Sequence, residues 1–366
     1  MRVAWACLPL AVAVFVVLVR VDRQIEPVAN YWPPIPPLTG VLAPNNRLDP
    51  AKQELLASNI PGPEDCVHDL RTGTLYLSAS DGWIYFIEAP VTAASAPKKL
   101  VYTGGRALGL AMDTPRNQLV FADKRGLMAV DLTTRQLHCL VTEVDGIPLG
   151  LTDDVAVAQD GTVYLTDATR LGLGSEEVLT ISALELLEGR GSGRLVKYDP
   201  ATRTATVLMR NLLFANGVAL SKNEDFLVVG DMGRAQILRL WLKGDRAGTR
   251  DVLIDNLVGM ADGIWTDPED GTFWVAVFAF RDGMSQLLSK TPFVAKILAN
   301  LPGWMLLPAI VPSPYNLVLH YDASGRLVES LHGTGQHAMP VTSVSRFDNK
   351  LFLGTLIGNG IRVLQL

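Results

Sequence analysis

A short pattern of strands and turns recurs six times along this chain of 366 residues. Its clearest copy occupies residues 212–220, 225–231 and 237–241, where alternating apolar and β-branched residues are bounded by Gly, Asn and Asp. Such alternation between turn residues predicts short antiparallel strands. One polar side chain, Asn216, lies at the entry to the first strand of this copy. The chain is therefore expected to be all-β and built from repeated units.

The copies can be aligned on the residues that end equivalent strands, which are Tyr76, Val120, Tyr164, Val228, Trp274 and Phe352. Twelve positions earlier lie Glu64, Leu108, Thr152, Asn216, Asp262 and Pro340, and in the third copy the polar residue is Asp153, one step further on. Six units of roughly 40 to 60 residues predict a six-bladed β-propeller of four-stranded blades. A strand from the region after Val41 is expected to pair with the last blade, residues 351–366, and so to close the ring.

Two segments interrupt the repeats and predict short helical insertions. Residues 175–190 carry apolar residues with acidic residues between them, as in a short helix. Residues 284–312 place apolar residues near helical spacing. Two alternatives stay open for this second insertion. It is either a helix packed onto the blades, or a lid or interfacial membrane helix near the pocket.

The N-terminal region predicts a membrane anchor. Residues 3–19 are apolar throughout, with Arg2 before them and Arg20 after them. This length is near the short end of a bilayer-spanning helix, and no small-x-small cleavage site closes the run. We therefore expect residues 1–24 to be an uncleaved signal anchor rather than a cleaved signal peptide. This single-pass transmembrane helix would leave the propeller on the exported side, whether periplasmic, lumenal or extracellular.

Residues 25–50 are rich in Pro and Asn and predict a stiff, extended linker that holds the globular part off the membrane. The propeller domain is expected to occupy residues 51–366.

Composition excludes some classes of site. The formal net charge is −5 and no basic block interleaves with aromatic residues, so a nucleic-acid partner is not expected. Cys7, Cys66 and Cys139 fit neither a disulfide framework nor a zinc site. Cys66 and Cys139 either pair in an oxidising compartment or are free buried thiols, which is the commoner outcome.

The aligned polar residues predict a metal site. The inner strand of each blade begins at one end of the central channel, so residues at matched positions converge. Glu64, Asp153, Asn216 and Asp262 would form an oxygen-rich ring, and acidic groups are rarely buried unpaired. A hard divalent cation such as Ca²⁺ accepts this set of oxygens. Taken singly, Asn216-Gly217 and Asp262-Gly263 also fit simple turns.

Two further side chains are candidates for substrate binding. Arg106 lies close to the second inner strand and would bind an anionic or carbonyl-bearing substrate, or else form a salt bridge to a ring carboxylate. His337 precedes the sixth inner strand and either faces the channel or lies on a surface loop. No Gly-x-Ser-x-Gly motif and no Ser/His/Asp set recommends a nucleophile.

Several motifs resemble the strictosidine synthase-like family, and within it the membrane-anchored branch of adipocyte plasma membrane-associated proteins. They occur in family order at residues 62–65, 105–110, 186–195, 214–220 and 237–244. The wider superfamily includes paraoxonases and senescence-marker gluconolactonases, which are six-bladed propellers with calcium in the channel. The resemblance implies that Glu64, Asn216 and Asp262 are catalytic-calcium ligands and that Asp153 replaces an Asn. It also implies a second, structural calcium at Asp65 and Asp154.

The chain departs from this pattern at two places. Leu108 stands where paraoxonases carry a histidine, and residues 339–343 hold no glutamate where strictosidine synthase uses one. The alkaloid-forming condensation is therefore disfavoured.

Two hypotheses of function stay open. The first is a calcium-dependent hydrolase of lactones or aryl esters, in which Asp262, or else Asp153, is the general base. The second is a non-catalytic, membrane-tethered propeller for binding or scaffolding, held together by calcium.

Overall fold

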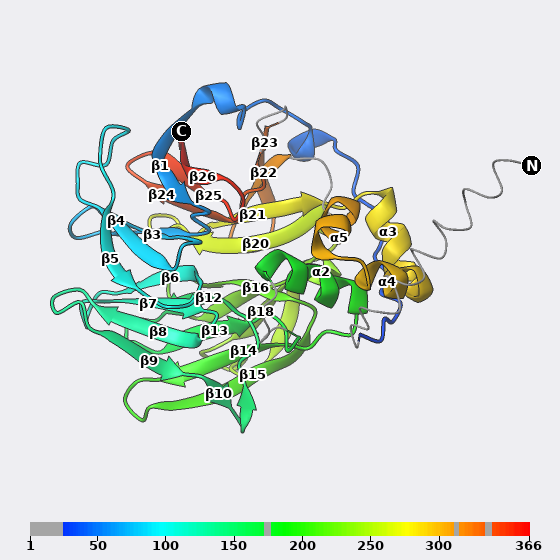
Figure 1. Cartoon of the computed structure of the whole chain (residues 1–366), viewed down its shortest axis with the longest axis horizontal. Helices are drawn as coiled ribbons and strands as arrows, with labels where there is room; N and C mark the ends of the chain where they lie inside the picture. The colour runs from blue at the N-terminus through cyan, green and yellow to red at the C-terminus, as the bar shows by residue number, and fades with distance from the viewer. Residues whose placement is uncertain (1–24, 172–176, 311–314, 334–338) are drawn as a thin grey trace, which may run out of the picture.

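Six four-stranded antiparallel sheets surround one central channel (Figure 1). The computed structural model describes residues 25–171, 177–310, 315–333 and 339–366. The six-bladed β-propeller expected from the repeats is therefore confirmed. The expected membrane helix falls in residues 1–24, outside the described residues. Within the described ranges, no helix is long and apolar enough to cross a membrane.

Each of the first five blades uses four strands from the innermost outward in chain order. Blade 1 holds β2 (Cys66–Asp69), β3 (Thr74–Ser78), β4 (Trp83–Ile87) and β5 (Lys98–Tyr102). Blade 2 holds β6 (Ala107–Asp113), β7 (Gln118–Asp123), β8 (Gly126–Asp131) and β9 (Leu137–Val141). Blade 3 holds β12 (Thr152–Val157), β13 (Val163–Asp167), β14 (Gly193–Asp199) and β15 (Thr204–Leu212).

Blade 4 holds β16 (Ala215–Leu220), β17 (Phe226–Asp231), β18 (Gln236–Trp241) and β19 (Arg250–Ile254). Blade 5 holds β20 (Gly259–Thr266), β21 (Phe273–Phe280), β22 (Asn316–Tyr321) and β23 (Leu327–Gly333). A small hairpin, β10 (Glu143–Val144) and β11 (Ile147–Pro148), lies between blades 2 and 3 in the chain.

Blade 6 joins the two ends of the propeller. Its strands β24 (Ser343–Phe347), β25 (Lys350–Gly354) and β26 (Asn359–Gln365) are completed by β1 (Gln53–Pro61), which pairs antiparallel with β26. The predicted closure is therefore confirmed. The N-terminal strand fills the outer position of the last blade, so the first and last repeats are joined in one sheet.

Apolar side chains from neighbouring blades pack face to face. One cluster joins Leu56 and Ile361 of blade 6 to Leu75 and Leu77 of blade 1. Another joins Ile84 of blade 1 to strands of blade 2. Cys66 is buried within the first cluster, whereas Cys139 is exposed, and both are free thiols.

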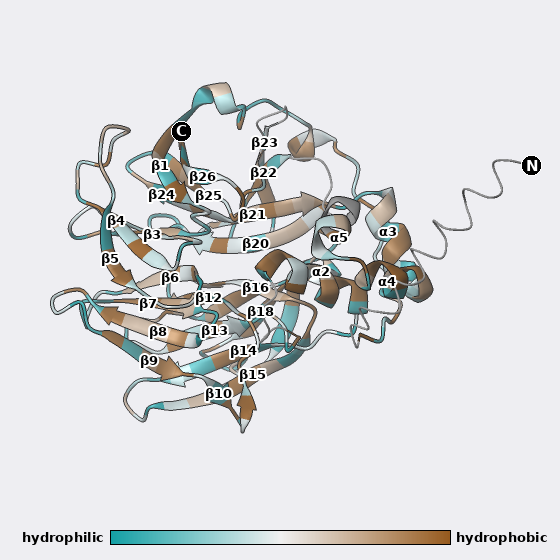
Figure 2. Cartoon of the chain, in the orientation of Figure 1, coloured by the Kyte–Doolittle hydropathy of each residue, from teal (hydrophilic) through white to brown (hydrophobic). Residues whose placement is uncertain are grey.

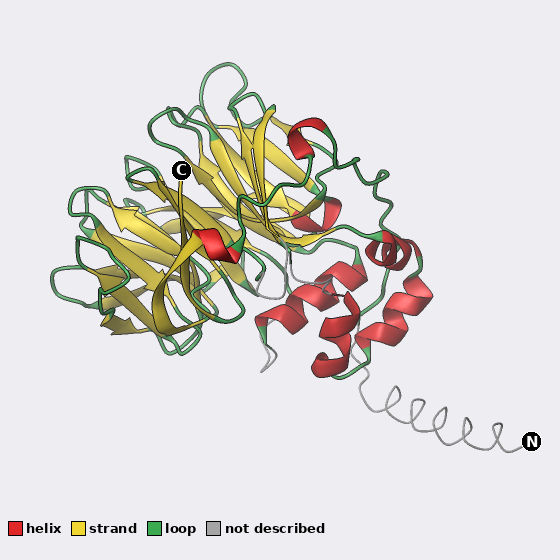
Figure 3. Ribbon diagram, turned by 90° about the horizontal axis from the view of Figure 1, so that it is seen from above, coloured by secondary structure: helices red, strands yellow, loops and turns green. Residues whose placement is uncertain are grey.

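Two helical insertions lie together on one side of the propeller (Figures 1 and 3). Helix α2 (Val178–Glu188) connects β13 to β14, and α3 (Gly283–Lys290), α4 (Pro292–Ala299) and α5 (Gly303–Ile310) connect β21 to β22. The first helix ends at Gly189, which adopts the left-handed conformation that favours glycine. Asp282 caps α3 through a capping box with Ser285. Both insertions are helical, as predicted.

The segment expected to be a spacer lies against the propeller. It contains no strand and only two short 3₁₀ turns, η1 (Gly40–Leu42) and η2 (Pro50–Lys52). Trp32 is buried, and its indole N–H donates to the carbonyl oxygen of Gly233 at 2.6 Å. Leu48 is fully buried beside blades 5 and 6. The segment is extended, but its apolar side chains attach it to the blades.

The closing strand allows a direct test of the blade 6–blade 1 contact. Leu56→Ala should lower the free energy of unfolding by about 2–5 kcal/mol, because this buried side chain leaves a cavity. Leu55→Ala on the same strand is the matched control: Leu55 is 40% exposed and Leu56 is 2% exposed. Urea unfolding of both variants measures the difference. Equal losses would contradict this account of closure.

Candidate metal centre

One residue from the start of each inner strand lines the same cavity at one end of the channel. These residues are Glu64, Leu108, Asp153, Asn216, Asp262 and Thr342. The sequence alignment correctly placed the first five, with Asp153 rather than Thr152 in blade 3. Its sixth position, Pro340, was wrong, because Thr342 supplies the residue from blade 6.

The lengths of the inner hairpins explain both offsets. Val228 pairs with Ala219 in blade 4, which is nine positions earlier. Tyr164 pairs with Ala156, so the hairpin of blade 3 is shorter by one residue. Phe352 pairs with Ser345, so the hairpin of blade 6 is shorter by two. Counting twelve residues back from Tyr164 and Phe352 therefore passes the ring residue of blade 3 by one position and that of blade 6 by two.

The three acidic ring residues lie close together and are buried. Each of Glu64, Asp153 and Asp262 offers a carboxylate oxygen, and these oxygens all lie within 4.8 Å of one another. Asn216 is buried and lines the same cavity, and its amide N–H donates to Sδ of Met232 at 3.8 Å. Glu64 Oε2 has no hydrogen-bond partner among the described residues. Three carboxylates and one amide, with one carboxylate oxygen of Glu64 buried and unpartnered, fit the ligand preference of a hard divalent cation.

Burial and mutual repulsion raise the pKa values of these acids. Burial raises the pKa of Asp153 to about 7. Burial, and then the neighbouring carboxylates, raise the pKa values of Glu64 and Asp262 well above their usual range. A bound cation would reverse these shifts, because its charge stabilises the ionised carboxylates.

Asn216-Gly217 and Asp262-Gly263 lie within strands β16 and β20, so the simple-turn interpretation is wrong. Their glycines permit close contact between inner strands. A Cβ on Gly217 would lie 2.4 Å from the carbonyl oxygen of Asp262, and a Cβ on Gly263 would lie 2.7 Å from that of Thr342. These positions require glycine because a side chain would separate neighbouring blades.

Asp65 and Asp154 line a second, smaller chamber of about 250 Å³. Asp65 accepts hydrogen bonds from the backbone N–H groups of Cys66 and Leu110, both at 2.7 Å. Asp154 accepts from those of Val155 and Val218, both at 2.8 Å. Each carboxylate therefore links its blade to the next one. A second metal at these residues stays a prediction, because both carboxylates already have backbone partners.

The ring residues form part of the wall of a cavity of about 730 Å³. Most of the remaining wall is apolar and includes Trp32, Phe214 and Met260, with helices α2 and α3 covering one side. This volume lies within the usual range for small-molecule sites, which are largely apolar with a few polar groups. Polar groups lie at the ring and also elsewhere on the wall, which includes Ser182, Asp282, Ser285, Ser289 and Tyr315.

The two weaker candidates have different outcomes. Arg106 is not among the residues that line the cavity; its Nη2 donates to the carbonyl oxygen of Gly62 at 2.8 Å. Its charge lowers the pKa of Glu64, although burial outweighs this effect. Among the described residues Arg106 forms no salt bridge to a ring carboxylate, and its Nη1 has no hydrogen-bond partner, so both expected roles of Arg106 stay predictions. His337 lies outside the described residues.

A tyrosine on the cavity wall was missed from the sequence. Tyr315 lines the cavity, and its hydroxyl lies 2.8 Å from Nδ1 of the buried His332. Ser330 donates to the carbonyl oxygen of Val41, so its oxygen accepts from His332 Nε2. Nδ1 is then the acceptor for the tyrosine O–H. Tyr315 lies outside the aligned strand positions, so the repeat carries no signal for it.

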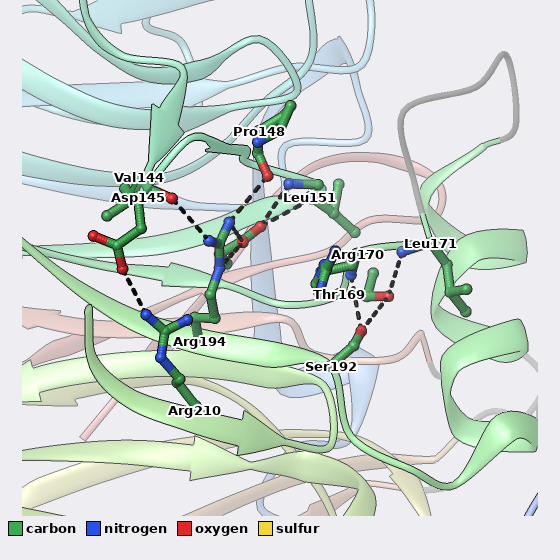
Figure 4. Close-up of polar contacts among 12 residues, drawn as sticks. Val144, Asp145, Pro148, Leu151, Thr169, Arg170, Leu171, Ser192, Arg194 and Arg210 are labelled. Atoms are coloured by element: carbon green, nitrogen blue, oxygen red, sulfur yellow. Dashed lines mark hydrogen bonds and ion pairs between the residues drawn. The ribbon is translucent and has the colours of Figure 1, made fainter. Parts of the chain in front are cut away.

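A buried ion pair positions the strand that carries Asp153. Asp167 accepts hydrogen bonds from the backbone N–H groups of Gly150 and Leu151, just before β12. Arg194 donates to Asp167 at 2.6 Å. It also donates to the carbonyl oxygen of Pro148 (Figure 4). Both side chains are almost fully buried. The pair thus holds the turn that leads into the ring.

Sequence comparisons place the chain in a family. A family model described as strictosidine synthase matches residues 153–245, and one described as strictosidine synthase-like, N-terminal, matches residues 40–87. Strictosidine synthase-like protein 3 of Arabidopsis thaliana is 33% identical over 267 residues, covering 72% of this chain and 67% of that protein. The chain belongs to the strictosidine synthase-like family. The adipocyte plasma membrane-associated protein of Rattus norvegicus is 30% identical over 363 residues, covering 94% of each chain.

Solved structures support the fold of this strictosidine synthase-like chain. A gluconolactonase from Xanthomonas campestris aligns with a TM-score of 0.60 at 17% identity, covering 94% of this chain and 99% of that one. Regucalcin from Agrobacterium tumefaciens, described as a calcium-binding protein, aligns with a TM-score of 0.56 at 14% identity, covering 85% and 90%. At these identities the likeness extends to the propeller fold alone.

The buried ion pair gives one prediction. Arg194→Ala should lower the free energy of unfolding by about 3–5 kcal/mol, because it leaves the Asp167 carboxylate buried and unpaired. The matched control is Arg210→Ala, which removes a neighbouring but exposed ion pair with Asp145 (Figure 4). The control should cost less than about 1 kcal/mol. Chemical denaturation compares the two variants, and an equal cost would contradict the role assigned to Arg194.

The raised pKa values give a second prediction. Because the folded acids hold protons that an unfolded chain would release, the stability of metal-free protein should fall as pH rises from about 4 to 7. Protons also compete with a cation for these oxygens. Ca²⁺ should therefore raise the Tm more at pH 7.5 than at pH 5.5. Calorimetry with EDTA or Ca²⁺ at both pH values checks this, and an equal rise at both would refute it.

Proposed function

We propose that this protein is a membrane-anchored, calcium-dependent hydrolase of lactones or aryl esters. The observation that carries the proposal is the ring of three buried carboxylates in the wall of a large, mostly apolar cavity. The names of relatives add support, because one is an adipocyte plasma membrane-associated protein and one structural neighbour is a gluconolactonase. Membrane association and lactone chemistry are assigned to this chain as part of the proposal.

Four residues would hold the calcium ion: Glu64, Asp153, Asn216 and Asp262. When bound, the ion supplies Lewis acidity to a substrate carbonyl oxygen. The amide of Asn216 contributes an oxygen without adding charge. The apolar wall would bind the hydrocarbon part of the substrate and exclude bulk water from the ester bond.

Asp262 is the best placed general base. Glu64, Asp153 and Asn216 line both the large cavity and the smaller chamber, whereas Asp262 lines the large cavity only. Its carboxylate would therefore face the substrate side, where it can accept a proton from the attacking water. Asp153 is the second choice, since it faces both chambers.

The residues that line the cavity also argue against a strictosidine synthase-type condensation. The blade 6 residues that line it are Thr342 and Leu356, so no carboxylate lines it from the described part of this blade. A condensing acid–base step would need such a group there. Hydrolysis needs only the ring and a water molecule.

The test is metal analysis combined with a substrate screen of the full chain in detergent. We expect bound calcium after dialysis and calcium-dependent turnover of at least one lactone or aryl ester. Asp262→Asn should lower kcat by about 10²–10⁴-fold, because the amide cannot accept the proton. Asp145→Asn, an exposed change away from the cavity, is the matched control and should retain the rate.

Two results would overturn the assignment. Unchanged turnover in Asp262→Asn would remove this residue from the reaction. A calcium-loaded protein that hydrolyses no panel member, but loses Tm in EDTA, would favour a non-catalytic propeller in which calcium only stabilises the fold.

A further inference from the structure

The helices between β21 and β22 expose large apolar side chains to solvent. We call α3, α4 and α5 the helical layer. Phe293 is 78% exposed and Trp304 is 77% exposed, and both are aromatic. Met284 and Leu287 of α3 are also more than half exposed, and Val294 and Met305 are partly exposed. Figure 2 shows hydrophobic residues along α3 and α4. Such a concentration of exposed apolar side chains is typical of a binding surface.

The charge of the helical layer fits an anionic surface. Residues 283–310 contain two lysines, Lys290 and Lys296, and no acidic residue, and the acidic residue next to them is the exposed Asp282 that caps α3. The chain as a whole is acidic, with a formal net charge of −5. An apolar layer with basic and no acidic residues matches the headgroup region of a membrane, where Trp and Phe bury their rings.

The described chain begins at this layer. Ile25 is buried in a cluster with Leu184 and Leu187 of α2, Ala295 and Ala299 of α4, and Leu306 of α5. Lys296 donates to the carbonyl oxygen of Ile25 at 2.5 Å. Only the five residues 20–24 separate the apolar run ending at Val19 from Ile25 of this cluster. The six extended steps from Val19 to Ile25 span at most about 20 Å, so an anchor at residues 3–19 would keep the layer close to the bilayer.

The helical layer is continuous with the cavity. Met284 lines the cavity and is 54% exposed, so it belongs both to the exposed surface and to the cavity wall. Leu288 of the same helix lines the cavity from a buried position. Met284 and Leu288 therefore lead from the exposed face of α3 to the wall that contains the carboxylate ring, beside the polar Asp282 and Ser285.

We propose that the helical layer docks into the interface of the membrane that holds the N-terminal anchor, with the cavity opening toward the bilayer. Lipophilic molecules dissolved in that bilayer can then enter the cavity past Met284 without crossing bulk water. For catalysis this rests on the proposed function, and it specifies the substrates as esters or lactones with a long apolar chain. The docking itself needs no turnover.

The docking test uses tryptophan quenching by lipid. The full chain is reconstituted in vesicles of phosphatidylcholine with one fifth phosphatidylserine, with and without bromine on the acyl chains. The emission lost in Trp304→Phe measures Trp304 alone, and we expect more than half of that emission to be quenched. Trp241→Phe is the matched control, because Trp241 lies on β18, where the guanidinium groups of Arg239 and Arg246 contact its ring, and should show no quenching.

Unquenched emission from Trp304 overturns the docking, whatever the activity screen finds. A blue-shifted but unquenched emission would mean that residues 1–24 or a second copy of the chain covers the layer instead.

The substrate test uses the double variant Phe293→Ser with Trp304→Ser, since neither residue lines the cavity. Its KM for a long-chain ester in vesicles should rise about tenfold, while kcat/KM for a water-soluble short-chain ester stays unchanged. Equal effects on both substrates would overturn entry from the bilayer. Because the quenching test needs no turnover, failure of the proposed hydrolase and failure of docking give different results.

Discussion

Three carboxylates, from Glu64, Asp153 and Asp262, are buried at the convergence of the inner strands, with oxygens within 4.8 Å of one another. Their mutual repulsion and lost hydration disfavour folding unless protons or a cation neutralise them. The surrounding structure maintains this arrangement. Glycines let the inner strands approach, and Asp65 and Asp154 link neighbouring blades through backbone N–H groups. A propeller built this tightly around an acidic centre is suited to holding a cation.

The cavity beside the ring combines features from distant parts of the chain. Trp32 comes from the segment before the propeller, α2 from blade 3, and α3 from blade 5. Ring closure by β1 and the burial of Leu48 bring the N-terminal segment back to blades 5 and 6. The N-terminal segment thus closes the propeller through β1, contributes Trp32 to the cavity wall and places Ile25 beside the helical layer.

Much of the fold and most of the ring could be predicted because the repeat is local. Alternation of apolar and polar residues predicts each strand, and counting twelve positions back from the strand ends identifies Asn216 and Asp262. The method fails where a turn changes length: the shorter hairpin of blade 6 makes Thr342, not Pro340, the sixth residue. Tyr315 and its partner His332 carry no such period, so only their hydrogen bond identifies them.

The sequence by itself determined the number of blades, the closing strand, the helical nature of both insertions and the acidic residues that converge. These are consequences of local pattern repeated along the chain. Only the tertiary structure decided that residues 25–50 pack on the blades, that Arg106 lies outside the cavity, and that α3 connects the exposed apolar layer to the cavity wall. Those features depend on contacts between residues far apart in the chain, about which local periodicity carries no information.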